Sequence, residues 1–197
     1  MPTPVNGHKL HPSINTQSGL YEFFEPAKWN FEIEGIAHAL GNLCRFTGQC
    51  DRFYSVAEHS VLVALYLQDV LKIRDKRLLR SAVLHDSAEC IIGDINSPLK
   101  SLIRHIVKPI ENAFLDEVDL RFGLDTRHPR IKDADGVLYL LEREFNMPML
   151  DRAHPEHHYL PIDDEVINAM PWFSKTVTYW EPKHAKHFFL RYWSALQ

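Results

Sequence analysis

Apolar residues recur every three or four positions over several stretches of the chain, a spacing typical of amphipathic helices. The first of these stretches, residues 33–46, predicts a helix that ends near Phe46. The same spacing predicts further helices over residues 55–67, 75–85, 99–122, 130–146 and from 182 into the 190s. No alternating strand pattern recurs, and neither an internal repeat nor a domain linker is present. The pattern therefore predicts an all-α fold, a single compact helical bundle.

Polar residues and glycines mark where these helices begin and end. Ser55 is a predicted N-cap, with Glu58 three residues later in the capping-box arrangement. Asp75 is expected to open the next helix, and Gly123 to stop the long one. The run of residues 93–98, which begins with glycine and ends with proline, predicts a loop.

The two ends of the chain depart from the helical pattern. Residues 1–30 are rich in Pro, Asn, Ser and Gly and then in aromatic residues, which predicts an extended N-terminal arm that packs on the domain. Residues 31–150 form the predicted helical core. Residues 151–197 are predicted to be a C-terminal extension of the same domain, in which a proline-containing stretch and a short extended piece over 176–180 precede the terminal helix.

Composition narrows the class of protein. A chain of 197 residues with 45% hydrophobic and 24% charged residues is typical of one globular domain. The net charge of −4 argues against a non-specific binder of nucleic-acid polymers or of membranes, because both usually carry a basic excess. No apolar run approaches the roughly 18 residues of a membrane span, and no signal peptide is visible. Three cysteines without zinc-site spacing predict reduced thiols in a cytoplasmic protein.

Ionisable residues lie within the apolar helical segments. His85 and Asp86 follow directly after an apolar helical run, and Glu89 lies on the same predicted helix face. His59 lies on the apolar face of its helix, and Asp135 faces the core side of another. Such groups are costly to bury unless they are paired or bind a metal. Each also has a plainer interpretation, as a surface or capping pair or as a hydrogen-bonded core histidine.

Two histidines and two aspartates would form a mixed nitrogen and oxygen site with open coordination positions. This set of ligands suits a divalent transition cation such as Mn, Co, Ni, Fe or Zn better than Ca²⁺. Open positions are what metal-assisted hydrolysis requires. The spacing in the sequence does not establish that the four side chains meet.

A family resemblance connects these residues. His59 in SVAEHS, His85–Asp86 in AVLHDSAE and Asp135 in IKDAD look like the H…HD…D signature of the HD phosphohydrolase superfamily. The run HDSAECIIGDINSPLK resembles the bacterial 5'-deoxynucleotidases. The run IAHALGNLCRFTGQCDRFYSVAEHS resembles small phage-encoded HD proteins that include dATP triphosphohydrolases. The resemblance covers about residues 14–150.

The resemblance implies a role for each of several residues. The metal ligands would be His59, His85, Asp86 and Asp135. Glu89 matches the carboxylate that positions or deprotonates the attacking water, although a surface glutamate is the plainer interpretation. Arg45 matches an arginine that binds phosphate, a task that suits its bidentate donors.

Further residues are assigned to the substrate. Asp94 matches a residue that contacts the deoxyribose, with a turn residue as the alternative. Phe46 stands where the bacterial deoxynucleotidases have Trp, and it either stacks on the sugar or base or belongs to the core. Lys100 lies on one strip with Arg104 and Lys108, which would either bind a longer phosphate tail or form a solvated basic face.

The leading hypothesis is a deoxynucleoside triphosphate hydrolase, with dATP as the candidate substrate, that releases a deoxynucleoside and triphosphate. The nearest alternative is a 5'-deoxynucleotidase acting on monophosphates. An alternative of another class is a nucleotide-sensing or regulatory module, and a further one is a structural helical bundle with incidental His and Asp residues. The resemblance also implies a homo-oligomer.

Overall fold

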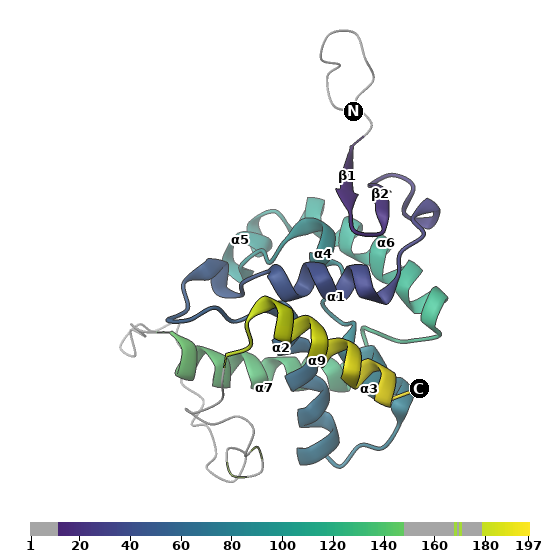
Figure 1. Ribbon diagram of the computed structural model, residues 1–197. Helices are drawn as coiled ribbons and strands as arrows, with labels where there is room; N and C mark the ends of the chain where they lie inside the picture. Colours follow the sequence, from purple (N-terminus) through teal and green to yellow (C-terminus); the bar gives the residue numbers. More distant parts are fainter. Residues whose placement is uncertain (1–11, 148–167, 169, 171–178) are drawn as a thin grey trace, which may run out of the picture.

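The computed structural model describes residues 12–147, 168, 170 and 179–197, and this part of the chain is mainly helical (Figure 1). The longer helices are α1 (Ile33–Asn42), α2 (Val56–Leu65), α3 (Lys76–Val83), α6 (Arg104–Phe122), α7 (Pro129–Asn146) and α9 (Pro182–Ala195). Two short helices, α4 (Glu89–Ile92) and α5 (Ser97–Leu102), lie between α3 and α6. The predicted helical class is confirmed. The predicted extended piece over 176–180 and the proline-containing stretch before it lie largely outside the described residues.

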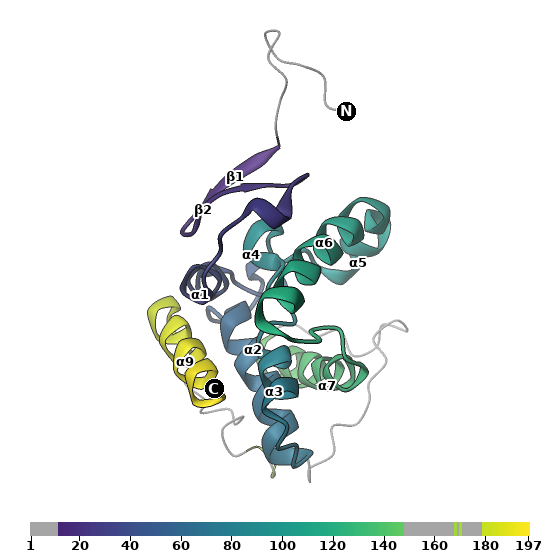
Figure 2. The same ribbon diagram turned by 90° about the vertical axis from the view of Figure 1, so that its right-hand side faces the viewer.

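Helix α2 forms the centre of the fold. Its residues 56–64 are all buried, and it contacts α1, α3, α7 and α9. Figure 2 shows α1 and α9 on one side of α2 and α7 on the other. A helix that is apolar on all sides is expected in such an interior position. The two ionisable residues of α2, Glu58 and His59, are therefore buried together with its apolar residues.

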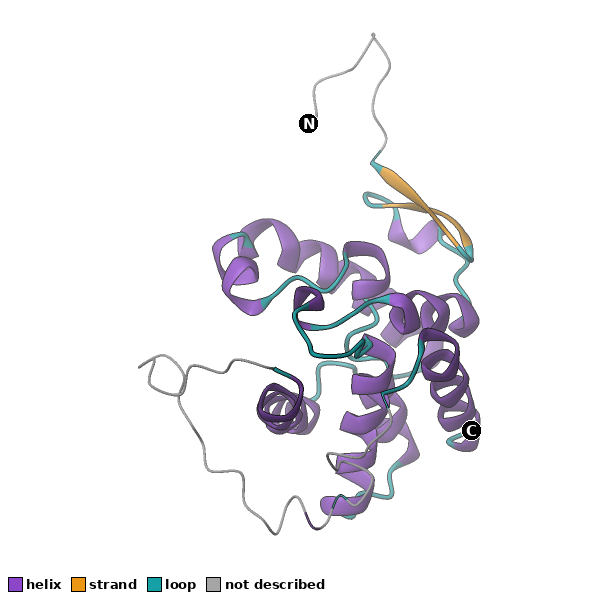
Figure 3. Ribbon diagram, turned by 60° about the vertical axis from the view of Figure 1, so that its left-hand side comes forward, coloured by secondary structure: helices purple, strands orange, loops and turns teal. Residues whose placement is uncertain are grey.

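Residues 12–30, the described part of the predicted extended arm, contain a hairpin. Strand β1 (Ser13–Thr16) pairs with strand β2 (Gly19–Glu22) in an antiparallel hairpin, which Figure 3 shows at one end of the described, otherwise helical part. Gly19 allows the tight turn with φ 100°, a value that side chains rarely tolerate. The strands are too short for their alternation to be recognised in the sequence. Tyr21 of β2 is buried and contacts Phe114 of α6.

The first helix ends earlier than the hydrophobic spacing predicts. Helix α1 stops at Asn42, and Leu43 is extended. Cys44 then forms an isolated bridge with Ser55, and the Arg45 amide donates to the Tyr54 carbonyl at 2.8 Å. A short 3₁₀ turn, η2 (Phe46–Gly48), follows. Helical periodicity continues through this segment although the backbone does not, and the change of direction fixes the position of Arg45.

The two predicted N-caps are confirmed. The Ser55 hydroxyl accepts from the Glu58 amide at 3.1 Å, and the Asp75 carboxylate accepts from the amides of Arg77 and Leu78. The other half of the predicted capping box is not observed. The Glu58 carboxylate instead accepts from the backbone N–H of Trp180 at 3.1 Å, which connects the start of α2 to the segment before α9.

The predicted helix over residues 75–85 is shorter than expected. Helix α3 ends at Val83, and residues 84–88 form successive tight turns before α4. The amide of Leu84 donates to the Ser81 carbonyl, and the amide of Ser87 donates to the Leu84 carbonyl, both three residues apart. His85 and Asp86 therefore lie in a turn and are not adjacent residues of a regular helix.

The later helices follow the predictions with one break. The stretch predicted as one helix over 99–122 is divided at Ile103 into α5 and α6, and Gly123 ends α6 with φ 67°. Helix α9 crosses α1 so closely that a Cβ on Gly41 would lie 2.9 Å from the carbonyl oxygen of Pro182. None of the described helices is long and apolar enough to span a membrane. The three cysteines are free thiols of intermediate exposure.

Candidate metal centre

Two histidine side chains direct unpartnered nitrogen atoms toward one another. Nδ1 of His59 lies 2.6 Å from the Glu142 carboxylate, and Nδ1 of His85 lies 2.7 Å from the Ala82 carbonyl oxygen. Because both partners are acceptors, each Nδ1 carries a proton, and in the neutral ring Nε2 keeps its lone pair. Both Nε2 atoms are buried without a hydrogen-bond partner among the described residues. Both atoms are therefore available to bind a ligand.

Two carboxylates lie beside these nitrogens. Asp135 Oδ1 lies 3.1 Å from His59 Nε2 and 3.9 Å from His85 Nε2. Asp86 Oδ2 lies 3.5 Å and 3.3 Å from the same two atoms. One ligand atom each from His59, His85 and Asp135 lies within 4.8 Å of the others, so that the three could hold a metal ion. The structure therefore brings together the four side chains that the sequence singled out.

The spacing of these atoms fits a divalent cation. Ligand atoms about 2.1 Å from one cation, at angles of about 90–110°, are separated by about 3.0–3.4 Å. Three of the four histidine–aspartate distances lie between 3.1 and 3.5 Å, and the fourth, from His85 to Asp135, is 3.9 Å. The Asp86 and Asp135 side chains are 22% and 38% exposed, whereas His59 is fully buried. The cluster therefore opens to solvent on the side of its carboxylates.

The local backbone explains why these side chains meet. The turn over residues 84–88 lets two adjacent residues, His85 and Asp86, direct their side chains to the same point. His59 comes from the buried α2, and Asp135 comes from α7, which packs against α2. The helical geometry expected for His85–Asp86 is thus wrong, but their predicted convergence is observed.

In the absence of a cation, the histidines and aspartates of the cluster shift one another's pKa values. Burial alone would lower the pKa of His85, but the negative charges of Asp86 and Asp135 outweigh it and hold the pKa well above its usual range. Burial would raise the pKa of Asp135, yet the two imidazoles hold it far below its usual value. The aspartates therefore stay ionised and attract protons onto the histidines. A divalent cation would compete for the same lone pairs.

Glu89 lies at the edge of this cluster as a buried acid. It is 7% exposed, and its Oε2 has no hydrogen-bond partner among the described residues. Burial, followed by the negative charges of Asp86 and Asp94, raises the pKa of Glu89 well above its usual value. A buried carboxyl group with a raised pKa beside a metal-binding cluster has the properties of a general acid–base group.

Arg45 is held in place by a buried glutamate. Its Nε donates to Glu142 Oε2 at 3.2 Å, and another guanidinium nitrogen lies 3.5 Å from Asp86 Oδ2. The Tyr54 hydroxyl donates to Glu142 Oε1 at 2.7 Å, the same oxygen that His59 contacts. Glu142 thus holds both a candidate metal ligand and the candidate phosphate-binding arginine.

Glu142 and Tyr54 are functional residues that were not identified from the sequence. A signal for Glu142 was available, because it follows Asp135 by seven residues, two turns along the same face of α7. It also lies next to the buried Leu141, where an acidic residue needs partners. Tyr54 gave no such signal, since its position depends on the bridge between Cys44 and Ser55.

The residues assigned to the substrate lie in different environments. Phe46 stacks on Tyr139, with ring centroids 6.0 Å apart, and its φ of 56° is unusual for a residue with a side chain. Burial raises the pKa of Asp94 despite the nearby charge of Arg45. Lys100 is not a freely solvated lysine, because its Nζ lies 2.5 Å from the carboxylate of Glu111. The roles of these residues toward a substrate remain predictions.

Comparison with known proteins relates the chain to HD-domain proteins. The sequence profile of the HD domain matches residues 45–122. An uncharacterised protein of Rhodobacter capsulatus, RCAP_rcc00048, is 36% identical over 130 residues, which are 62% of this chain and 66% of that protein. The uncharacterised protein YfdR of Escherichia coli is 31% identical over 132 residues, 66% of this chain and 70% of that protein. The matched region thus spans about two thirds of each relative, and neither name states a substrate.

Proposed function

The chain belongs to the HD-domain superfamily of metal-dependent phosphohydrolases, and from this premise we propose that it hydrolyses a phosphate bond of a deoxynucleotide. The observation that carries the proposal is the pair of unpartnered Nε2 atoms facing two carboxylates. The proposed metal ligands are His59, His85, Asp86 and Asp135. Their mixed nitrogen and oxygen chemistry suits Mn, Co, Ni, Fe or Zn.

The cation would supply Lewis acidity, which polarises a phosphoryl oxygen and lowers the pKa of a water molecule. The remaining steps are assigned to the side chains. Glu89 takes a proton from the attacking water, since its Oε2 is unpartnered and its pKa is raised toward that of an effective base. Arg45 directs a guanidinium that is already fixed by Glu142 toward the phosphoryl oxygens, whose charge it stabilises.

Of the possible substrates, we favour a deoxynucleoside triphosphate, with dATP as the first candidate. Water adds to the α-phosphorus, the bond from phosphorus to the 5' oxygen breaks, and this oxygen takes up a proton. The products are a deoxynucleoside and triphosphate. Asp94 and Phe46 are the proposed contacts to the sugar and base, because both lie near Arg45, the proposed phosphate ligand. A deoxynucleoside monophosphate, which would yield orthophosphate, is the alternative substrate for the same chemistry.

A panel of substrates tests the proposal. Purified protein with Mn²⁺ or Co²⁺ is incubated separately with each dNTP, dNMP and NTP, and the products are separated by chromatography. Release of triphosphate from dNTPs is the expected result. Release of orthophosphate from dNMPs alone would support the 5'-deoxynucleotidase alternative. No product from any nucleotide, with metal demonstrably bound, would contradict both and favour a nucleotide-sensing module.

A further inference from the structure

A cluster of positive charges on α5 and α6 is organised around one buried carboxylate. Glu111 of α6 is 5% exposed. Lys100 of α5 lies 2.5 Å from one of its oxygens, and Lys108 lies 3.6 Å from the other. Ion pairing with this carboxylate restricts the Lys100 ammonium most strongly, because that contact is the shorter one. Glu111 therefore orients Lys100, and Lys108 lies close to the same carboxylate.

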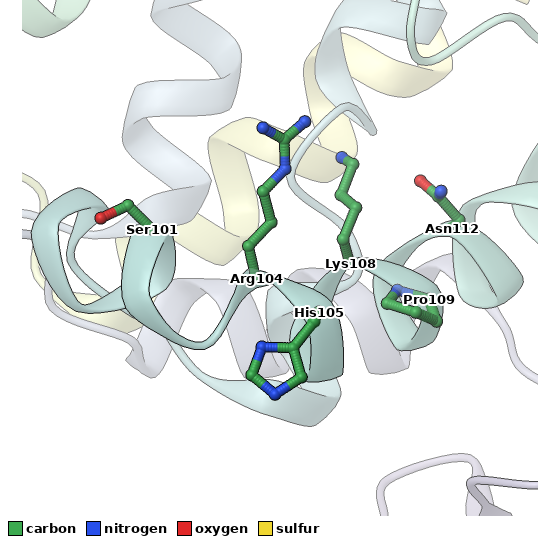
Figure 4. Close-up of a pocket in the computed structure, with 6 residues that line it drawn as sticks. All are labelled: Ser101, Arg104, His105, Lys108, Pro109 and Asn112. Atoms are coloured by element: carbon green, nitrogen blue, oxygen red, sulfur yellow. The ribbon is translucent and has the colours of Figure 1, made fainter.

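Arg104 adds a third cation to this cluster. In Figure 4, Arg104 and Lys108 extend side by side from α6, whereas His105 points in the opposite direction. Arg104 is exposed and has no ion-pair partner among the described residues. The two side chains line an open groove of about 650 Å³, together with Ser101, His105, Pro109 and Asn112. The cluster thus holds three cations and one anion, and two of the cations, Lys100 and Lys108, contact Glu111.

Lys100 connects this cluster to the proposed metal centre. Burial lowers the pKa of Lys100, and the contact with Glu111 raises it. The negative charges of Glu89 and Asp86 raise it further, by smaller amounts. At the metal centre, Arg45 is already engaged by Glu142 and Asp86. The positive charges that could bind additional phosphate groups are therefore those of Lys100, Arg104 and Lys108. A monophosphate bound at the metal centre would leave Arg104 and Lys108 without a role.

We propose that Lys100, Arg104 and Lys108 form a subsite for the polyphosphate tail of the substrate, held in place by Glu111. The subsite rests on the proposed function and selects the triphosphate from its two candidate substrates. Arg104 supplies planar bidentate donors, and the lysines supply compact charges, a combination suited to phosphate groups. Glu111 is a positioning residue, because it contacts the lysines and not the tail.

The test removes the two outer cations and leaves Lys100 paired with Glu111. The variant is Arg104→Gln combined with Lys108→Gln. The matched control is Lys183→Gln combined with Arg191→Gln, which removes the same charge from exposed positions on α9. Both proteins are compared with wild type in thermal unfolding, in kcat/KM for dATP and dAMP, and in calorimetric binding of inorganic tripolyphosphate.

The subsite predicts a selective loss. Removing two charge-assisted contacts should weaken tripolyphosphate binding and lower kcat/KM for dATP by about 10- to 100-fold. The kcat/KM for dAMP should stay within about threefold of wild type, and the control should resemble wild type. Tripolyphosphate should inhibit dATP hydrolysis competitively, because it would occupy the subsite that binds the triphosphate tail of dATP. Non-competitive inhibition would indicate a separate effector site and overturn the proposal.

Two outcomes separate this inference from the proposed function. If dATP is hydrolysed by wild type and the Arg104→Gln/Lys108→Gln variant does no worse than the control, the subsite is wrong and the proposed function stands. If no nucleotide is hydrolysed but tripolyphosphate binding is lost only in that variant, the polyphosphate subsite stands and the proposed function fails.

Discussion

Glu142 and His59 form a fully buried pair in which a carboxylate oxygen lies 2.6 Å from the imidazole Nδ1. The contact fixes the ring so that Nε2 faces Asp86 and Asp135. Glu142 also accepts from Arg45 and Tyr54. One carboxylate thereby sets the orientation of a proposed metal ligand and of the proposed phosphate ligand.

Glu142→Gln should weaken metal binding and leave the ligands themselves intact. The amide lacks the charge that fixes the His59 tautomer, and substitutions of this kind cost about 10- to 100-fold in metal affinity. The measurement is the Kd for Mn²⁺ by competition with a chelating dye. Asp133→Asn, an exposed acid-to-amide change on the same helix, is the control. Equal affinities in both variants would show that Glu142 does not orient the site.

Glu89→Gln should abolish most of the hydrolysis while metal binding persists. Loss of a general base lowers rates by about 10²- to 10⁴-fold. The amide keeps the size of the side chain, so a change in fold is not expected. Single-turnover hydrolysis and metal content are measured on the same preparation, with the exposed Glu34→Gln as control. A rate within a few-fold of wild type would remove Glu89 from the mechanism.

The stability of the metal-free protein should fall as the pH rises above the usual histidine range. The folded pKa of His85 is held above its unfolded value, so its contribution is complete at low pH and is lost as the pH rises through the folded pKa. The pKa of His59 is raised in the same direction. Saturating Mn²⁺ binds the deprotonated rings and should remove this loss. Thermal unfolding with chelator and with Mn²⁺ between pH 6 and 9 measures the difference, and parallel curves would contradict the site.

Glu58→Gln should make the protein more stable at alkaline pH. Burial, opposed by the Trp180 hydrogen bond and aided by the charge of Glu142, raises the pKa of Glu58 to about 8. The folded protein therefore holds a proton that the unfolded chain loses near pH 4.5, and folding stability declines between these values. Glutamine stays neutral and still accepts the hydrogen bond from Trp180. Thermal unfolding of the metal-loaded proteins at pH 6 and 9 should show an advantage of the variant that is larger at pH 9 than at pH 6.

The sequence predicted best what local chemistry determines. The N-caps at Ser55 and Asp75 depend on residues within one helical turn, and Gly123 ends its helix through its own backbone freedom. The break after α1 and the turn at residues 84–88 depend on pairing with distant residues or on tight backbone geometry. Helical periodicity carries neither kind of information, so Arg45 and His85 were identified while their backbone was predicted incorrectly.

The candidate site shows the same division. The convergence of His59, His85 and Asp135 was expected from a family resemblance, and spacing alone did not establish it. Glu111 was not identified from the sequence, because nothing in the sequence places it between Lys100 and Lys108. A residue whose role is to hold other side chains is recognised only once its partners are located.

The most direct test is to add Mn²⁺ stepwise to the metal-free protein and to follow bound metal and dATP hydrolysis together. Both signals should rise in proportion and stop at one cation per chain, and His85→Ala should abolish both. Hydrolysis that persists in the metal-free protein would contradict a metal-dependent mechanism. Absence of Mn²⁺ binding in wild type and in parallel titrations with Co²⁺, Ni²⁺, Fe²⁺ and Zn²⁺ would contradict the proposed metal centre itself.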